Sequence, residues 1–267
     1  KDNYVNIFNK IKDIMFLINR TFIADANIND NTYIILGVDF ILDNNNNPYL
    51  IEINAYPNLW YSDKLEFSIK NNMLNDFFEL YIEPKINNTE PKQGDWILCN
   101  PLYEPTHYQF KFRKILEHHL YLNLKEYDFN KNKSKILSLN YWSKEAFDKS
   151  KKGVLYYVDG KLINLVDNKK QLFLFCKKNN LQNLIPDTYL NITEIKDKTG
   201  YFFLKNNTSC SRKNLYCLSF DELSKYPTNN SIIQRNIKNP LLFNKKKLVF
   251  GVWFMIIKNN YYIHNEI

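Results

Sequence analysis

The sequence predicts a mixed fold of helices and strands, α+β or α/β. The chain has 267 residues, 45% of them hydrophobic, which is enough to bury a core. Segments with apolar residues at helical spacing occur beside short apolar runs that Asn, Gly or Pro residues interrupt. Both kinds of segment recur along the chain, which favours a mixed architecture over an all-α or all-β one.

The predicted elements follow in order. Helices are expected at 4–24 and 65–82, and they flank strands at 33–42 and 48–54. Pro84, Pro91 and Gly94 mark a domain boundary near residue 90. Residues 95–125 show no clear order of elements. Short strands are expected at 136–142 and 154–158, then a helix at 168–180 and strands at 201–205, 215–218, 231–237, 247–257 and 261–263.

Charge is distributed unevenly. The net charge is +8, but residues 1–92 carry 8 basic and 13 acidic residues, whereas residues 93–267 carry 28 basic and 15 acidic residues. This asymmetry indicates two units. The basic part suits an acidic protein, a membrane surface or a nucleic acid, or it is simply a solvated face. Without an RNA-recognition motif, nucleic acid is the weakest of these candidates.

Several classes of protein lack support. The sequence has neither a G-x-G-x-x-G nor a P-loop motif. With no apolar run near 18 residues, no membrane-spanning helix is expected. The four cysteines form no C-x-x-C pair and are expected to be reduced thiols in the cytoplasm. The 40 Asn residues are interpreted as a bias toward AT-rich codons.

The segment 33–57 carries the chemistry. If Asp43 pairs with Pro48 across a four-residue loop, antiparallel register places Asp39 opposite Glu52, with Asn54 on the same face. Two opposed carboxylates repel each other unless a cation lies between them. Magnesium prefers such oxygen ligands, so Asp39, Glu52 and Asn54 are candidate metal ligands. The alternative is a half-exposed hairpin with two solvated acids. The other face is expected to be core: Ile34, Leu36, Val38, Phe40, Leu42, Tyr49, Ile51 and Ile53.

These residues carry a resemblance to a known family. The string Leu36-Gly37-x-Asp39-Phe40-x-x-Asp43, followed by Pro48-x-Leu50-x-Glu52-x-Asn54-x-x-Pro57, resembles the magnesium-binding end of the tubulin-tyrosine-ligase-like family. The later residues Asp63, Ile69-Lys70 and Met73-Leu74-x-Asp76 resemble a segment of its glutamylase members. The resemblance covers about residues 4–85. It implies an ATP-grasp fold, with ATP and Mg²⁺ as cofactors, and amide formation through an acyl phosphate.

The second part resembles a different region of the same family. Residues 162–190 are similar to its lysine-led helix, and Phe202-Phe203-Leu204-Lys205 to the strand that ends in its nucleotide-binding lysine. Residues 232–237 and 240–242 are similar to the hinge that contacts adenine. The resemblance implies nucleotide contacts from Lys205, Gln234, Arg235, Ile237 and Lys247.

This second part departs from the family pattern. The loop 209–214 has no Gly, although the family has a glycine-rich loop there. Val249 and Gly251 stand where the family has an acid and an arginine. The expected organisation is therefore the C-terminal half of one ATP-grasp module (1–90), a connector (91–136) and the N-terminal half of a second, degenerate module (137–267). The chain is either an excerpt of a tandem protein or a permuted one, in which both parts build one site.

The resemblance implies an ATP- and magnesium-dependent ligase that joins an amino acid, Glu or Tyr, to a protein carboxylate. An acidic protein tail, such as that of tubulin, is the expected partner of the basic part. Two alternatives stay open: another ATP-grasp carboxylate–amine ligase, and a decayed pseudo-ligase that binds proteins through its basic surface.

Overall fold

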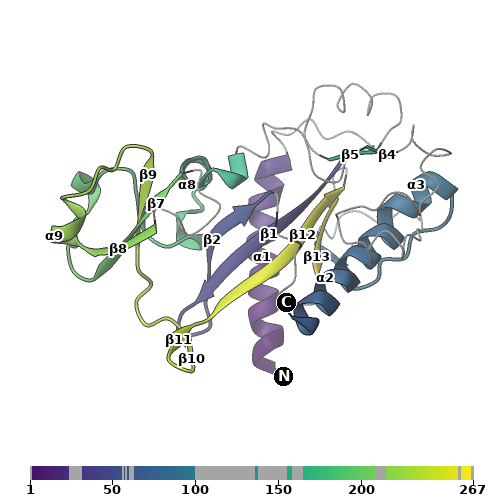
Figure 1. The fold of residues 1–267 in the computed structure, drawn as a ribbon, viewed down its shortest axis with the longest axis horizontal. Helices are drawn as coiled ribbons and strands as arrows, with labels where there is room; N and C mark the ends of the chain where they lie inside the picture. The colour runs from purple at the N-terminus through teal and green to yellow at the C-terminus, as the bar shows by residue number, and fades with distance from the viewer. Residues whose placement is uncertain are drawn as a thin grey trace. The chain divides into compact units, whose positions relative to one another are not determined.

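The computed structural model describes residues 2–23, 32–55, 57, 59, 63–99, 136–137, 155–157, 165–207, 215–257 and 260–265. The chain divides into two compact units. Figure 1 labels helices and strands of the chain. Unit 1 comprises residues 1–22, 38–54 and 161–251, and unit 2 comprises residues 23–37, 55–160 and 252–267. These bounds differ from the predicted boundaries at 90 and 137. The loop 209–214 and most of the predicted connector lie outside the described residues.

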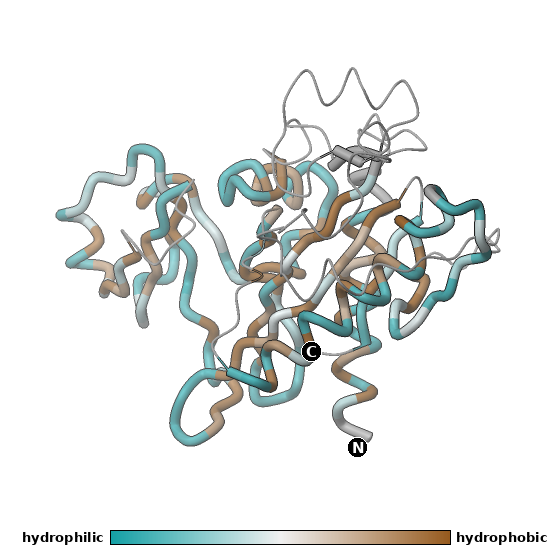
Figure 2. The backbone as a smooth tube through the Cα atoms, turned by 45° about the vertical axis from the view of Figure 1, so that its right-hand side comes forward, coloured by the Kyte–Doolittle hydropathy of each residue, from teal (hydrophilic) through white to brown (hydrophobic). Residues whose placement is uncertain are grey.

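Helix α1 (Asp2–Ile23) confirms the helix predicted at 4–24. Its apolar residues recur every three or four positions and so form one stripe, and Figure 2 shows hydrophobic and hydrophilic residues alternating along the tube from the N-terminus. The stripe is buried: Ile7, Phe8, Ile11, Ile14, Met15 and Ile18. The helix also touches the first hairpin, where the Lys10 ammonium donates to the Asn47 amide oxygen at 3.0 Å.

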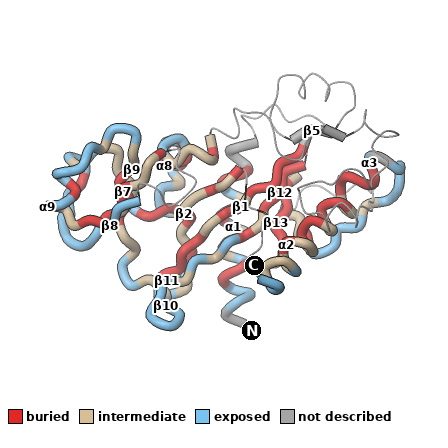
Figure 3. The backbone as a smooth tube through the Cα atoms, viewed as in Figure 1, coloured by how far each residue is buried: buried red, intermediate tan, exposed pale blue. Residues whose placement is uncertain are grey.

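Strands β1 (Thr32–Leu42) and β2 (Pro48–Asn54) pair with each other, which confirms the predicted hairpin. The Asp43 carboxylate shapes the turn by accepting the backbone N–H groups of Asn45 and Asn47 at 2.9 and 2.8 Å. The expected core face of β1 is fully buried, but Ile35 and Ile41 on its other face are buried as well. Figure 3 shows this burial along β1. The acid face is therefore largely covered and not an open, solvated surface.

Unit 1 also contains a four-stranded sheet of order β6-β9-β7-β8. Its strands are β6 (Thr188–Tyr189), β7 (Tyr201–Asn206), β8 (Leu215–Ser219) and β9 (Ser231–Arg235), all paired antiparallel. Its core is apolar: Ile195, Phe202, Leu204, Leu218, Leu223 and Ile233. The strands predicted at 201–205, 215–218 and 231–237 are thus confirmed to within two residues.

Helices and turns complete unit 1. Helix α8 (Lys169–Lys178) confirms the helix predicted at 168–180 and begins where the Asn168 side chain accepts the N–H groups of Lys170 and Gln171. The short helices are η2 (Gln182–Leu184), η3 (Ile192–Glu194) and α9 (Phe220–Leu223). The two-stranded ribbon of β10 (Leu242–Phe243) and β11 (Lys246–Lys247) follows β9.

Unit 2 combines one sheet with a helical segment. Among the described residues, the sheet has seven strands, in the order β3-β13-β12-β1-β5-β4 with β2 paired to β1, and the residues of β1 and β12 are divided between the two units. Its strands besides β1 and β2 are β3 (Trp96–Leu98), β4 (Ile136–Leu137), β5 (Leu155–Tyr157), β12 (Val249–Ile257) and β13 (Asn260–His264). The helix predicted at 65–82 is α2 (Lys64–Phe77), which continues as the π-helix η1 (Phe78–Ile82) and as α3 (Glu83–Asn87). Asp63 caps α2 by accepting the N–H group of Glu66 at 2.9 Å.

The Asp76 carboxylate on α2 joins three elements of unit 2. It accepts the backbone N–H group of Asp95 at 2.8 Å and lies 3.1 Å from Nε2 of the fully buried His264. The ring of Trp96 packs edge-on against His264. Gly94 has a φ of +57°, and a Cβ atom there would lie 2.3 Å from the Asp76 carboxyl carbon. This cluster therefore holds α2, β3 and β13 together.

Among the described residues, no helix combines the length and the apolar character needed to cross a membrane.

Candidate functional site

The candidate site begins with a carboxylate pair on the first hairpin. Asp39 on β1 and Glu52 on β2 are half-buried, and Asp39, when protonated, donates a hydrogen bond to the Glu52 carboxylate. The predicted placement of these two acids side by side is confirmed. Burial and the charge of Glu52 raise the pKa of Asp39 to about 6. The hairpin therefore holds two acids together at an electrostatic cost.

Two lysines from distant parts of the sequence approach this pair. The Lys169 ammonium, at the start of α8, lies 3.2 Å from Oε2 of Glu52, and its side chain is only 11% exposed. Burial works to raise the pKa of Glu52, but the positive charges of Lys169 and Lys205 lower it on balance. The second cation, Lys205 at the end of β7, interacts with both acids. The site thus contains two positive and two negative groups.

Lys205 is held in position by a chain of hydrogen bonds. Its ammonium donates to Oε1 of Gln234 at 2.6 Å, the Gln234 amide donates to the Thr188 hydroxyl at 3.2 Å, and that hydroxyl donates to the Pro186 carbonyl at 2.7 Å. The register of the sheet produces this chain, because Gln234 on β9 is paired with both Thr188 and Phe203. Burial lowers the pKa of Lys205 to about 8.

The carboxylate oxygens of the acid pair are the type of ligand atom that magnesium prefers. Two carboxylates suffice when phosphate oxygens supply further ligands. The third predicted ligand, Asn54, donates its amide N–H to Oε1 of Glu52 at 3.5 Å, which is a weak contact. Among the described residues, no group of three or more His, Cys, Asp or Glu side chains could hold a metal ion. A cation here would therefore depend on Asp39, Glu52 and ligand oxygens together.

Glycine stands beside the acid pair on β12. A Cβ atom at Gly251 would lie 3.7 Å from Oδ1 of Asp39, which is an ordinary contact distance. Position 251 therefore faces the carboxylate. The structure leaves it without a side chain that could neutralise Asp39.

The remaining predicted nucleotide contacts are Arg235, Ile237 and Lys247, and of these Lys247 lies near enough to Lys205 to help lower its pKa. Arg235 is buried, and its guanidinium contacts the Thr199 carbonyl at 2.8 Å and the Asp197 carboxylate at 3.3 Å. Lys247 donates to the side chain of Asn236 and lies over the ring of Phe203. Ile237 lines a pocket together with Arg235. The structure therefore brings Lys205 and Gln234 to the acid pair, whereas the Arg235 side chain is engaged in contacts within the protein.

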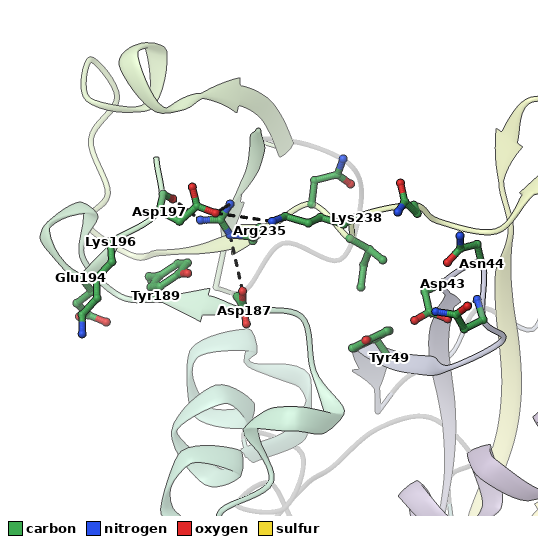
Figure 4. Close-up of a pocket in the computed structure, with 14 residues that line it drawn as sticks. Asp43, Asn44, Tyr49, Asp187, Tyr189, Glu194, Lys196, Asp197, Arg235 and Lys238 are labelled. Atoms are coloured by element: carbon green, nitrogen blue, oxygen red, sulfur yellow. Dashed lines mark hydrogen bonds and ion pairs between the residues drawn. The ribbon is translucent and has the colours of Figure 1, made fainter. Parts of the chain in front are cut away.

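That pocket has a volume of about 680 Å³ and lies wholly within unit 1 (Figure 4). Its walls come from the hairpin turn, β6, η3 and the segment after β9. The lining residues are Asp43, Asn44, Asn45, Tyr49, Asp187, Tyr189, Glu194, Lys196, Asp197, Arg235, Asn236, Ile237, Lys238 and Asn239. Neither member of the acid pair lines it.

Sequence reasoning missed Lys169. It lies within the helix predicted at 168–180 and is the first residue of α8, but it lies more than 100 residues from Glu52 along the chain. Its neighbour Lys170 is exposed, so local sequence does not distinguish the two. The signal that could have singled out Lys169 is its position directly after the helix cap Asn168.

Fold and site together define an α+β protein whose two carboxylates and two lysines could receive a ligand with both signs of charge. Comparison with known families finds a match for the first part of the chain. The model of the tubulin-tyrosine ligase family matches residues 1–91, the part that carries Asp39, Glu52 and Asn54. The resemblance predicted for residues 4–85 is thereby confirmed. No curated protein was found to match the chain.

Proposed function

We propose that this chain forms the site of an ATP- and magnesium-dependent ligase of the tubulin-tyrosine-ligase type. It would join an amino acid, Glu or Tyr, to a protein carboxylate through an acyl phosphate. The observation that carries the proposal is the ion pair between Lys169 and Glu52, with Lys205 beside the same acids. The ion pair brings residues from both parts of the chain into one site.

The charges of the site suit a metal–triphosphate ligand. Lysines bind phosphate as point charges, and carboxylates bind magnesium. Asp39 and Glu52, with Asn54, would hold the ion, and Lys169 and Lys205 would contact phosphate oxygens. When bound, magnesium supplies charge neutralisation and alignment of the phosphates. Gln234 orients Lys205, so that its ammonium is fixed before a ligand arrives.

The acceptor is proposed to be an acidic protein segment, such as the tail of tubulin. The net positive charge of residues 93–267 would steer such a segment toward the protein and accelerate association. An ATP-grasp ligase that acts on a small peptide shares the same site and differs only in the acceptor.

A second candidate function has its own support. By the resemblance of the second part, Val249 and Gly251 stand where the family has an acid and an arginine, and Gly251 faces Asp39. A pseudo-ligase that binds nucleotide without turnover would tolerate this loss. Such a protein would use its basic surface to hold a partner.

Nucleotide binding is the first test. We expect calorimetry to show magnesium-dependent binding of a non-hydrolysable ATP analogue. Lys169→Met should weaken it by about tenfold or more, because a largely buried charge contact to phosphate is lost. Lys170→Met, the exposed neighbour on the same helix, is the matched control and should bind normally. If the affinity for the ATP analogue changed neither on removal of magnesium nor in Lys169→Met, the proposal would be overturned.

The same experiment has a predicted pH dependence. Asp39, with a pKa of about 6, is charged above that pH, and Lys205, with a pKa of about 8, is charged below that value. Binding should therefore be strongest between about pH 6 and 8 and weaken on both sides.

Turnover separates the candidates. Labelled Glu or Tyr should enter an acidic protein in an ATP-dependent reaction that Asp39→Asn abolishes. Label found only in a small peptide would instead support the other ATP-grasp ligase. Nucleotide binding without any product would favour the pseudo-ligase.

A further inference from the structure

The two-stranded ribbon of β10 and β11 carries large apolar side chains that face solvent. Leu242 is 55% exposed and Phe243 is 66% exposed, and Figure 3 shows the ribbon as an exposed part of the chain. A single exposed apolar side chain needs no explanation, but neighbouring ones indicate an interaction surface. The ribbon lies within unit 1 and contains no member of the acid pair.

The tip of the ribbon is a tight turn with a defined backbone. Phe243 on β10 pairs with Lys246 on β11 in antiparallel register, so that Asn244 and Lys245 alone form the turn. Both turn residues have a positive φ, 49° and 62°, which is the requirement of a type I′ turn. This turn matches the natural twist of two paired strands, and so the tip holds its shape without a partner.

The base of the ribbon is attached to the first hairpin. The N–H group of Leu241 donates to the Leu42 carbonyl, and that of Asn44 donates to the Asn239 carbonyl, both at 2.8 Å. Since these contacts involve only backbone groups, they leave the side chains of the tip available. The apolar side chains are therefore presented by an element that is fixed at its base.

The charge of the tip is positive. Lys245 and Lys246 are exposed, and neither forms an ion pair within the described part of the chain. The other two lysines of this stretch have contacts: Lys238 lies 3.8 Å from the Asp197 carboxylate, and Lys247 donates to a neighbouring side chain. The sequence from residue 223 to residue 265 contains no Asp or Glu. The charge of the tip therefore favours an anionic partner.

We propose that the β10–β11 tip inserts into the interface of a membrane that contains anionic phospholipids. Leu242 and Phe243 would enter the boundary between headgroups and acyl chains, while Lys245 and Lys246 would contact lipid phosphates. Successive side chains of a strand point to opposite faces, so the two apolar residues lie on both faces of the ribbon. A fluid bilayer surrounds such a tip, whereas an acidic protein segment would cover one face. This arrangement favours the bilayer.

The test is co-sedimentation of the whole chain with vesicles of phosphatidylcholine, with or without phosphatidylserine. We expect binding that requires phosphatidylserine and weakens as salt is added. Phe243→Ser should weaken binding by about tenfold or more, because the apolar contact with the bilayer is lost. The double variant Lys245→Gln/Lys246→Gln should have an effect of similar size. The replaced side chains are exposed, so the fold should stay intact.

Two control variants account for general attraction, because the chain carries a net charge of +8. Lys177→Gln/Lys178→Gln removes the same charge from exposed positions at the end of α8. Leu65→Ser removes an apolar side chain that is 72% exposed elsewhere in the chain. Both should bind vesicles nearly as the wild type does. Equal losses in the two lysine variants, or normal binding by Phe243→Ser, would overturn insertion of the tip.

Soluble polyglutamate tests the rival partner, an acidic protein. If polyglutamate binds with the same dependence on Phe243, Lys245 and Lys246, and vesicles do not bind, the tip is a protein-binding surface and the membrane proposal is overturned. The proposal does not depend on the proposed ligase activity. Because none of these substitutions changes Lys169, Lys205 or the acid pair, binding of the ATP analogue should be the same in every variant.

Discussion

Asp39 in unit 1 and Asp76 in unit 2 are both half-buried carboxylates, but their surroundings differ. Asp76 accepts a backbone N–H group and contacts His264, and a glycine packs against it. Asp39 faces a second carboxylate and a glycine without a side chain, and its pKa stays raised to about 6 because Lys169 and Lys205 offset only part of the effect of burial and of the Glu52 charge. One carboxylate is satisfied by its neighbours, and the other is left in conflict with them.

The different surroundings of Asp39 and Asp76 indicate that one aspartate has a functional role and the other a structural role. A satisfied polar cluster fixes one arrangement of its elements. A carboxylate pair that repels itself lowers stability and is retained where a ligand relieves the repulsion. Substitutions in the two regions should therefore change stability in opposite directions.

The largest effect is expected at Gly94. Gly94→Ala would place a Cβ atom 2.3 Å from the Asp76 carboxyl carbon, at a φ of +57°. We expect the free energy of unfolding to fall by about 3 kcal/mol or more, since overlap adds to backbone strain. Urea denaturation measures this. Gly200→Ala is the control, because Gly200 has a φ of +82° but no atom within 4 Å of the added Cβ, and it should cost only about 1 kcal/mol. Equal losses in both variants would show that overlap at Asp76 is unimportant.

A smaller loss is expected at His264. His264→Leu keeps the volume of this fully buried side chain but removes the contact with Asp76. We expect a loss of about 2–3 kcal/mol, because the carboxylate loses a buried partner. His264→Gln, which retains a hydrogen-bond donor, should recover part of the loss in the same denaturation assay. If His264→Leu were as stable as the wild type, the contact between His264 and Asp76 would not contribute to stability, and Asp76 would not have the structural role assigned to it.

The smallest effect has the opposite sign. Asp39→Asn should raise the free energy of unfolding at pH 7 by about 1–2 kcal/mol, since it removes a charge whose pKa is raised. The pKa of Asp39 in the folded state, about 6, exceeds its ordinary value of 3.8. The wild type should therefore gain stability as the pH falls from about 6 to about 4, and the variant should not. A variant less stable than wild type at pH 7 would mean that Asp39 is structural.

Local sequence predicted most elements of this fold. Helical spacing located α1 and α8, and alternation located the hairpin β1–β2 with the acids on one face. Strands β3, β6 and β10, each of three residues or fewer, were not predicted. Such short strands are defined by their partners and not by their own pattern.

The site was predictable only in part, for a related reason. The spacing of Asp39 and Glu52 follows from one hairpin, and so their contact could be inferred from register. The ion pair between Glu52 and Lys169 depends on how segments far apart in the chain meet. The same holds for the pocket walls, which combine residues 43–49 with residues 187–239.

The high Asn content of this chain affects the backbone conformations that its turns can adopt. Of the seven non-glycine residues that the described part of the chain holds at positive φ, six are Asn: Asn46, Asn88, Asn180, Asn230, Asn239 and Asn244. Asn enters this left-handed conformation more readily than most side chains. A coding sequence that drifts away from GC-rich glycine codons can therefore keep its tight turns. With only 6 Gly residues in the chain, Asn occupies most of the left-handed positions that the described non-glycine residues adopt.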